Sequence, residues 1–312
     1  MTNDKVPEFL YKYRKLKNRN VFYKYDGDEI IGFDDNGLDA LSKGKIWFSH
    51  VAYLNDPYEN QGDYDSSSLY TNLNDYLRTM PPNVPLNIKN FLSLLKEKGV
   101  SEENVINVIE ASLPKEDQLQ FDVPRRLREL DREKQKTGIL SLSETYKSLL
   151  MWPYYADDHY GYCLEFSPKE QHDRYHNGLS HNKFIGKVVY DFRYYTFADV
   201  NPYYRFDSES MTEDDYLEFK KRVFCHKSLE WAHEKEWRIF LDITNFKASD
   251  KATGALLPFP EKLTTIYCGA RMQEPAIEAL KLAVSMGKYG YVPKFKKAKL
   301  LKGKFGLDFE DC

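Results

Sequence analysis

The stretch from His226 to Phe240, HKSLEWAHEKEWRIF, holds the residues of this chain best suited to chemistry. Side chains two apart on a strand point to the same face. We therefore expect Glu234, Glu236 and Arg238 to line one side of a strand, with Trp237 on the other side. Two carboxylates beside a guanidinium are costly to bury unless they are hydrated, paired or catalytic. The pattern predicts either a catalytic site or an ion-paired, solvated face of a sheet.

A second candidate is Met151–Gly161, MWPYYADDHYG, which combines aromatic rings with titratable groups. Tyr154 and Tyr155 offer stacking surfaces beside His159, and such a combination is typical of a ligand pocket. His159 is either an acid or base in catalysis or a hydrogen-bond donor that orders the loop.

Two further motifs lie in the first sixty residues. LYKYR carries Lys12 and Arg14, and the planar fork of an arginine suits a phosphate or a carboxylate, although such residues are also common surface groups. Asn55 and Asp56 precede Pro57, and we expect this segment to form a tight polar turn rather than to take part directly in catalysis.

The sequence does not favour a metal site. His172 and His176 have the spacing of one helix face but lack a third ligand, and His233-Glu234 lacks the second histidine of HExxH. Neither a common phosphate-binding glycine loop nor GxSxG is present. The lysines of residues 294–304 form a basic strand and tail, which either contacts nucleic-acid phosphates or solvates a surface.

The elements that position these residues alternate between strands and helices in a way that predicts an α+β fold. We expect a mixed or antiparallel central sheet in a single domain over residues 1–312, with a helical insertion at residues 66–137. An amphipathic helix is predicted over Glu274–Met286. The expected strands are residues 9–14, 45–49, 138–143, 161–167, 186–195, 236–243, 263–269 and 291–300.

Composition narrows the class of protein. The chain has 312 residues, of which 30% are charged, with a mean hydropathy of −0.65 and no apolar run near 18 residues, so we expect no membrane span. A net charge of −3 argues against a protein whose surface is dominated by the positive charge that binds nucleic acid. Four widely spaced cysteines and the lack of a signal sequence predict a cytoplasmic chain with reduced thiols. Its 24 tyrosines suit a half-hydrated ligand cleft or a tyrosine-rich sheet.

Five blocks, in order, resemble a bacterial domain-of-unknown-function family, number 2971 (DUF2971). They are LYKYR, KIWFSHVAYLNDPYE, LMWPYYADDHYGYCLEF, KSLEWAHEKEWRIF and IYCGA. The resemblance covers most of the chain outside the expected insertion. It implies a shared fold and carries no settled activity.

A second resemblance is to the ADP-ribosyltransferase-like superfamily, especially its toxin and phage-defence branches. Those enzymes hold NAD with a polar residue on an early strand, place an aromatic ring against the nicotinamide and carry a glutamate on a late strand. Arg14 or its rival Lys12 matches the first position, Tyr154 or Tyr155 the second and Glu236 the third. The literal His-Tyr-Glu and Arg-Ser-Glu signatures are absent. The expected insertion also stretches the spacing.

This second resemblance implies NAD as the substrate and cleavage of its nicotinamide–ribose bond. Glu236 would stabilise the oxocarbenium character that develops. Arg14 and Arg238 would bind the cofactor, and Glu234 or His159 would activate an acceptor or water. The implied biology is a toxin or anti-phage effector with a protein or nucleic-acid acceptor and a possible cognate antitoxin.

Two other hypotheses stay open from the residues alone. Asp157 and Asp158 with Glu234 and Glu236 would suit Mg²⁺ in a nuclease or other phosphodiesterase, because hard cations prefer carboxylates. Alternatively, the charged blocks only fix the fold of a non-catalytic sensing or interaction module. Nicotinamide release, a need for divalent ions, or neither activity would distinguish the three.

Overall fold

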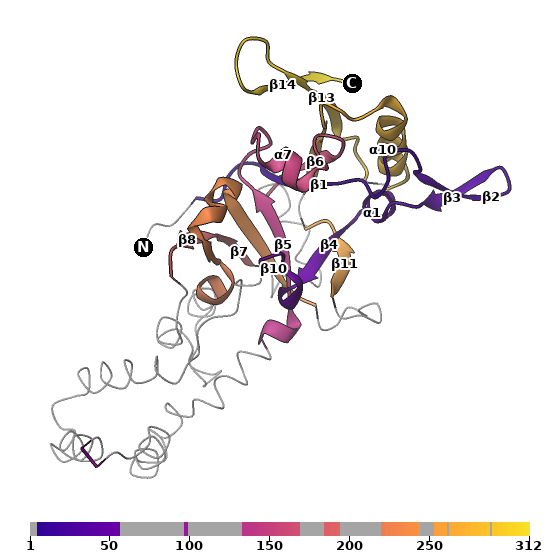
Figure 1. Ribbon diagram of the computed structural model, residues 1–312. Helices are drawn as coiled ribbons and strands as arrows, with labels where there is room; N and C mark the ends of the chain where they lie inside the picture. The colour runs from indigo at the N-terminus through magenta and orange to yellow at the C-terminus, as the bar shows by residue number, and fades with distance from the viewer. Residues whose placement is uncertain are drawn as a thin grey trace. The chain divides into compact units, whose positions relative to one another are not determined.

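The computed structural model describes residues 5–56, 97–98, 133–168, 184–193, 220–243, 253–260, 262–287 and 289–312. The chain divides into two compact units, residues 1–55, 136–192 and 227–312 and residues 56–135 and 193–226. Figure 1 follows the chain from indigo to yellow. Most of the expected helical insertion at residues 66–137 lies outside the described residues. The elements and the site described below belong to the first unit, apart from His226, the first residue of β9.

A ten-stranded sheet forms the centre of this unit, in the order β11-β4-β5-β1-β6-β12-β13-β14, with β10 beside β5 and β7 beside β10. Its strands are β1 (Leu10–Arg14), β4 (Lys45–His50), β5 (Thr137–Ser143), β6 (Tyr162–Ser167), β7 (Phe184–Lys187), β10 (Glu236–Asp242), β11 (Gly254–Pro258), β12 (Lys262–Cys268), β13 (Lys294–Leu300) and β14 (Leu307–Asp311). Neighbours pair antiparallel except β12 and β13, which are parallel. The expected α+β class with a mixed sheet is confirmed.

Two pairs of short strands and several helices lie outside this sheet. They are the hairpin β2 (Tyr23–Asp26) and β3 (Glu29–Phe33), the strands β8 (Val189–Asp191) and β9 (His226–Ser228), the helices α1 (Asn36–Ser42), α7 (Met151–Tyr155) and α10 (Glu274–Met286), and the 3-10 helices η1 (Val51–Tyr53) and η4 (Leu229–Glu234). None of the helices in the described ranges is long and apolar enough to cross a membrane.

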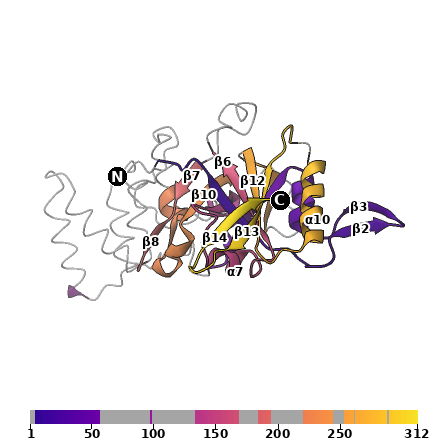
Figure 2. The ribbon, with the colours of Figure 1, turned by 90° about the horizontal axis from the view of Figure 1, so that it is seen from above.

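The amphipathic helix α10 covers one face of the sheet, next to α1, as Figure 2 shows from above. Its buried residues include Ile277 and Leu280, which join Leu164 and Ile266 of the sheet in one apolar cluster. This helix is also the crossover between the parallel strands β12 and β13, as a parallel pair requires. The predicted bounds Glu274–Met286 are confirmed.

The central strands β5 and β10 are buried on both faces. Six of the seven residues of β5 are buried, and in β10 only Asp242 is partly exposed. The charged start of β10 is ion-paired, as the second interpretation of its sequence predicts, but it does not lie on the solvated face that this interpretation also predicts. Burying charge in a central strand is costly, so its ionic partners decide whether the strand is stable.

Two strands, β4 and β1, pair with different parts of one edge of β5, and we call the place where they separate the fork. On the other edge β5 pairs with β10 from Ser143 opposite Glu236 to Thr137 opposite Asp242. On the forked edge, β4 meets β5 at residues 138–139 and β1 meets it at Ser143. Residues 140–142 thus lie between two diverging strands, and the candidate site is built around this place.

Candidate functional site

One lysine, Lys227 on β9, joins two buried glutamates. Its Nζ lies 2.6 Å from Glu234 Oε2 and 3.3 Å from Glu236 Oε2. All three residues are less than a tenth exposed, so water weakly screens their charges. The ring of Trp231 adds a cation–π contact, with its centroid 4.9 Å from Lys227 Nζ. One ammonium therefore holds two carboxylates together at the centre of the site.

Glu236 also forms an ion pair with Arg238, two residues further along β10. Arg238 Nε donates to Glu236 Oε1 over 2.8 Å and Nη2 donates to Oε2 over 3.1 Å, which is a bidentate pair. Burial by itself raises the pKa of Glu236. The charges of Arg238 and Lys227 and hydrogen bonds from Arg238 and Ser141 outweigh it and lower that pKa to about 2. Glu236 is therefore a fixed anion at neutral pH.

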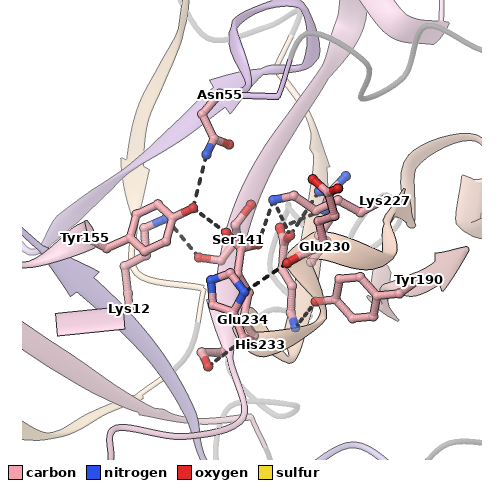
Figure 3. A network of polar contacts seen from close by, with 12 residues as sticks. Lys12, Asn55, Ser141, Tyr155, Tyr190, Lys227, Glu230, His233 and Glu234 are labelled. Carbon is pink, nitrogen blue, oxygen red and sulfur yellow. Dashed lines mark hydrogen bonds and ion pairs between the residues drawn. The ribbon is translucent and has the colours of Figure 1, made fainter. Parts of the chain in front are cut away.

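Glu234 faces a different set of donors, which come from α7 and the segment after β4. The hydroxyl of Tyr155 donates a hydrogen bond to Glu234 Oε1, and Asn55 Nδ2 donates to that hydroxyl over 3.1 Å. Burial, followed by the contact with Glu234, raises the pKa of Tyr155, which keeps its proton. Figure 3 shows Asn55, Tyr155 and Glu234 in this line.

The backbone between the two glutamates corrects one expectation from the sequence. Glu234 is the last residue of η4 and does not belong to the strand, which begins at Glu236. Lys235 between them has a left-handed backbone, with φ of 47°, so the alternation of a strand ends there. Ser143 Oγ donates to the Glu234 carbonyl over 2.7 Å, and the Glu236 N–H donates to the hydroxyl of Tyr190 over 2.8 Å.

Lys12 lies at the fork of the sheet. Its Nζ donates to the carbonyl oxygen of Ser141 over 2.9 Å, where β1 and β4 separate from β5. Burial and the nearby charge of Arg14 lower the pKa of Lys12 to about 8, whereas Glu236 and Glu234 act in the opposite direction. The structure therefore brings Lys12 into the electrostatic field of the two glutamates.

Arg14 lies two residues further along β1, next to the start of α1. It hydrogen-bonds the hydroxyl of the fully buried Tyr162, with Asp35 close to the same hydroxyl. Asp35 caps α1 by accepting from Leu38 N over 2.8 Å. A Cβ on Gly37 would lie 2.6 Å from the Tyr162 hydroxyl, so only glycine leaves room for this arrangement. The cofactor-binding role expected for Arg14 stays a prediction.

Tyr154 and His159 lie around α7 in different surroundings. Tyr154 is 65% exposed, and its ring centroid lies 6.0 Å from that of His233. The His159 ring stacks on Trp152, with centroids 5.5 Å apart, and its carbonyl accepts from Arg271 N. Burial lowers the pKa of His159, and Arg271 adds to the effect. The contacts of His159 lie with Trp152 and Arg271, apart from the glutamate cluster.

Sequence reasoning missed three members of the cluster. Lys227 lies in β9 and Glu234 ends η4, so the two residues do not share one regular element. The sequence predicts only a turn at Asn55, whereas the structure shows that its side chain also contacts the Tyr155 hydroxyl. Tyr190 lies 46 residues before Glu236. The available signal for Lys227 was chemical, because two buried carboxylates require cations.

The described residues offer no group of three or more histidine, cysteine, aspartate or glutamate side chains suited to a metal ion. Asp157, one of the carboxylates considered for Mg²⁺, forms a bidentate pair with Arg19, with both N···O distances 2.8 Å. The carboxylates at the site, Glu234 and Glu236, face an ammonium and a guanidinium. Both carboxylates are thus paired with side-chain cations.

In a comparison with protein families, residues 151–239 match a family model. The matching family is DUF2971, a protein family of unknown function. The DUF2971 match spans α7, β6 and most of β10, and includes Tyr155, Lys227, Glu234, Glu236 and Arg238. The expected resemblance to DUF2971 is thus confirmed over this segment. No curated protein and no solved structure matches the chain.

Proposed function

We propose that the cluster around Lys227 is the active site of an NAD-consuming enzyme of the ADP-ribosyltransferase type, on a related fold. The observation that carries the proposal is the pair of carboxylates, Glu234 and Glu236, held by one ammonium and flanked by the ring of Tyr155. Cleaving the nicotinamide–ribose bond needs a fixed negative charge and a second group that handles a proton or an acceptor.

Glu236 supplies the fixed negative charge in this proposal. Breaking the glycosidic bond develops positive oxocarbenium character on the ribose, and a preorganised carboxylate stabilises that charge. A pKa of about 2 keeps Glu236 ionised throughout the physiological range. Arg238 orients the carboxylate by its bidentate contact, so it acts as a positioning residue for Glu236.

Glu234 and Tyr155 act on the acceptor. Glu234 Oε1 accepts a hydrogen bond from the Tyr155 hydroxyl, so an acceptor hydroxyl or water that displaces this contact would meet a carboxylate placed to take its proton. The Tyr155 ring offers the stacking surface for nicotinamide. Asn55 orients the Tyr155 hydroxyl, and this contact lies on the exposed side of the cluster, from which the substrate would enter.

Cations on β1 would meet the pyrophosphate of NAD. Lys12 lies in the field of the two glutamates, and Arg14 is its neighbour on the same strand. Arginine binds phosphate oxygens in pairs, and a lysine acts as a point charge. The acceptor would be a protein or a nucleic acid, and an effector of this type in the cytoplasm would need a cognate antitoxin.

Release of nicotinamide from NAD by the purified chain tests the proposal. We expect Glu236→Gln to lower the release rate by about a hundredfold or more, because the uncharged amide cannot stabilise the oxocarbenium ion. Glu165→Gln is the matched control. Glu165 is another buried glutamate of the sheet, held by Tyr267 and Thr264 hydroxyls over 2.6 Å each, and it lies outside the cluster.

The result separates the proposal from a purely structural cluster. A folded wild-type chain that releases no nicotinamide in the presence of candidate protein and nucleic-acid acceptors would overturn the proposed function. Equal losses of activity in Glu236→Gln and Glu165→Gln, in step with stability, would also contradict a catalytic role for Glu236.

A further inference from the structure

Three consecutive residues shortly after α7 have left-handed backbones. The φ angles of Asp157, Asp158 and His159 are 49°, 51° and 72°, and we call these three residues the left-handed turn. Residues other than glycine adopt this conformation rarely and mostly as single residues, and a run of them persists only where the surrounding structure holds it. The last residue of α7 is Tyr155, whose hydroxyl donates to Glu234. The turn therefore needs contacts that hold it, and it begins two residues after a member of the candidate site.

Backbone hydrogen bonds join the left-handed turn to α7. Ala156 N donates to the Trp152 carbonyl over 3.0 Å, and Gly161 N donates to the Ala156 carbonyl over 2.8 Å. Across the turn, Tyr160 N donates to the Asp157 carbonyl over 2.8 Å. A displacement of the turn is therefore transmitted to the end of α7.

The far end of the left-handed turn packs against its neighbours through the backbone. The His159 carbonyl accepts from Arg271 N over 3.0 Å. A Cβ on Gly269 would lie 2.1 Å from the His159 carbonyl oxygen. A Cβ on Gly161, which follows the turn, would lie 2.2 Å from the Arg14 carbonyl oxygen. These two glycines leave room for the close approach, so this end of the turn is fixed against the end of β1 and the segment after β12.

The near end of the left-handed turn is held by Arg19, from the segment after β1. Arg19 Nε donates to Asp157 Oδ2 and Nη2 donates to Oδ1, each over 2.8 Å. The guanidinium also lies over the Tyr160 ring, with Cζ 3.8 Å from the centroid. The Arg19 and Asp157 side chains are 46% and 27% exposed, and an exposed ion pair contributes little to the stability of a whole fold. The pair therefore acts locally, on the turn.

We propose that Arg19 is a positioning residue for Tyr155. Its pair with Asp157 holds the left-handed turn, and the turn keeps the Tyr155 hydroxyl in contact with Glu234, the contact that Figure 3 shows. Arg19 follows β1, the strand on which the cations for NAD are proposed, so the pair connects that strand with the helix that carries the stacking ring. An effect of Arg19 on the rate of reaction rests on the proposed function, whereas its effect on the position of Tyr155 does not.

Nuclear magnetic resonance of the full chain tests the position of Tyr155 without NAD. The tyrosine rings carry a carbon isotope label at Cζ, the atom that bears the hydroxyl and senses its hydrogen bonds, and Tyr155→Phe identifies the Tyr155 signal. We expect Arg19→Met to shift this signal. Asp157→Asn should shift it in the same direction, because asparagine tolerates the left-handed backbone but cannot form the ionic pair.

A neighbouring ion pair supplies the matched control for this measurement. Lys17 and Asp34 form an exposed pair of 2.9 Å, and Lys17 stands two residues before Arg19. Lys17→Met should leave the Tyr155 signal in place. An unshifted Tyr155 signal in Arg19→Met, or an equal shift in Lys17→Met, would overturn the proposal.

Steady-state kinetics test the consequence for nicotinamide release. We expect Arg19→Met to lower kcat by about fivefold at similar KM, with an unfolding midpoint in urea close to that of the wild-type chain. Because Arg19 acts through the Tyr155 hydroxyl, Arg19→Met should lower kcat no further in the Tyr155→Phe background. Lys17→Met should leave kcat unchanged. Equal fractional losses of kcat in the two backgrounds, or an unchanged kcat in an active chain, would overturn the positioning role.

The two measurements separate this proposal from the proposed function. A wild-type chain that releases no nicotinamide overturns the proposed function, and the Tyr155 signal then decides by itself whether Arg19 positions that ring. An active chain in which Arg19→Met changes neither the Tyr155 signal nor kcat overturns the role of Arg19 and leaves the proposed function standing.

Discussion

Lys227 Nζ lies 2.6 Å from Glu234 Oε2, and the lysine is one of the most deeply buried cations among the described residues. The same ammonium reaches Glu236 at 3.3 Å, so two glutamates that a left-handed Lys235 separates share a single charge partner. Including Arg238, the cluster holds two buried cations and two buried anions. Such a cluster is electrically balanced only as a whole, and each removal should therefore have a large effect.

Removing Arg238 alone should destabilise the fold strongly. Arg238→Met leaves Glu236 buried with only Lys227, and breaking a buried pair in this way costs about 3–5 kcal/mol of unfolding free energy. The double variant Arg238→Met/Glu236→Met should lose less stability than Arg238→Met alone, because no uncompensated charge remains. Urea unfolding of both chains checks this order. A double variant that is less stable than the single variant would contradict it.

A surface pair provides the matched comparison for Arg238. Glu278 and Lys281 on α10 form an ion pair of 3.0 Å, with side chains 58% and 35% exposed. Lys281→Met should change the free energy of unfolding by no more than about 0.5 kcal/mol, because exposed pairs contribute little. A loss as large as that of Arg238→Met would show that burial is not what makes the buried pair important.

Acid should destabilise the wild-type chain partly through Glu236. Its folded-state pKa of about 2 lies below the ordinary value of 4.5, so the unfolded state binds the proton first as the pH falls. The contribution is fully present above pH 4.5 and is lost as the pH falls towards 2. Glu236→Gln should flatten the slope of unfolding free energy against pH in that window. An unchanged slope would show that Glu236 is not held ionised by its partners.

Alkaline pH should stabilise the folded chain through Lys12, whereas acid destabilises it through Glu236. Its folded-state pKa is lowered to about 8 from 10.5, so the folded chain gives up this proton before the unfolded chain does. The stability contribution of Lys12 should therefore rise between pH 8 and pH 10.5. We expect Lys12→Met to remove this rise from the pH dependence measured by urea unfolding. Parallel curves for the two chains would contradict the assignment.

The left-handed backbone at Lys235 should be essential for the distance between the two glutamates. A β-branched residue at φ of 47° is strained, so Lys235→Val should lower stability by about 1–2 kcal/mol and reduce nicotinamide release. Lys235→Gly tolerates this backbone and should retain both properties. Equal behaviour of the two variants in unfolding and activity assays would show that this conformation is dispensable.

The Tyr155 hydroxyl should matter for rate more than for substrate binding. Tyr155→Phe keeps the ring and removes the hydroxyl that joins Asn55 to Glu234, so kcat for nicotinamide release should fall by about tenfold or more at similar KM. Tyr289→Phe removes a comparable half-buried hydroxyl, which donates to the Leu41 carbonyl, and should leave kcat unchanged. A rise in KM with unchanged kcat would assign Tyr155 to substrate binding alone.

The sequence predicts the elements with strong periodicity and misses the contacts between distant ones. Glu274–Met286 and the strand that begins at Glu236 follow directly from their apolar patterns. The extension of that strand to Glu234 was wrong because Ser143 holds a turn there, which no local pattern encodes. The hairpin of β2 and β3 was missed although Asp26-Gly27 is a turn signal.

Some members of the site could be predicted from the sequence and others could not, because contacts between distant segments leave no local pattern. Glu234, Glu236 and Arg238 could be found because they stand together in one block. Lys227 and Asn55 join them only through folding, from β9 and from the segment after η1. The fork in β5, where Lys12 finds the Ser141 carbonyl, depends on the register of three strands and has no signature in any one of them.

The most direct test compares activity and stability in the same preparation of Glu236→Gln. Nicotinamide release from NAD and the free energy of unfolding are measured for this variant, for Glu165→Gln and for the wild-type chain. A catalytic Glu236 predicts that release falls about a hundredfold or more while a folded protein remains, and that Glu165→Gln keeps its activity. Activity that follows stability equally in both variants, or a wild-type chain that leaves NAD intact, would contradict the account.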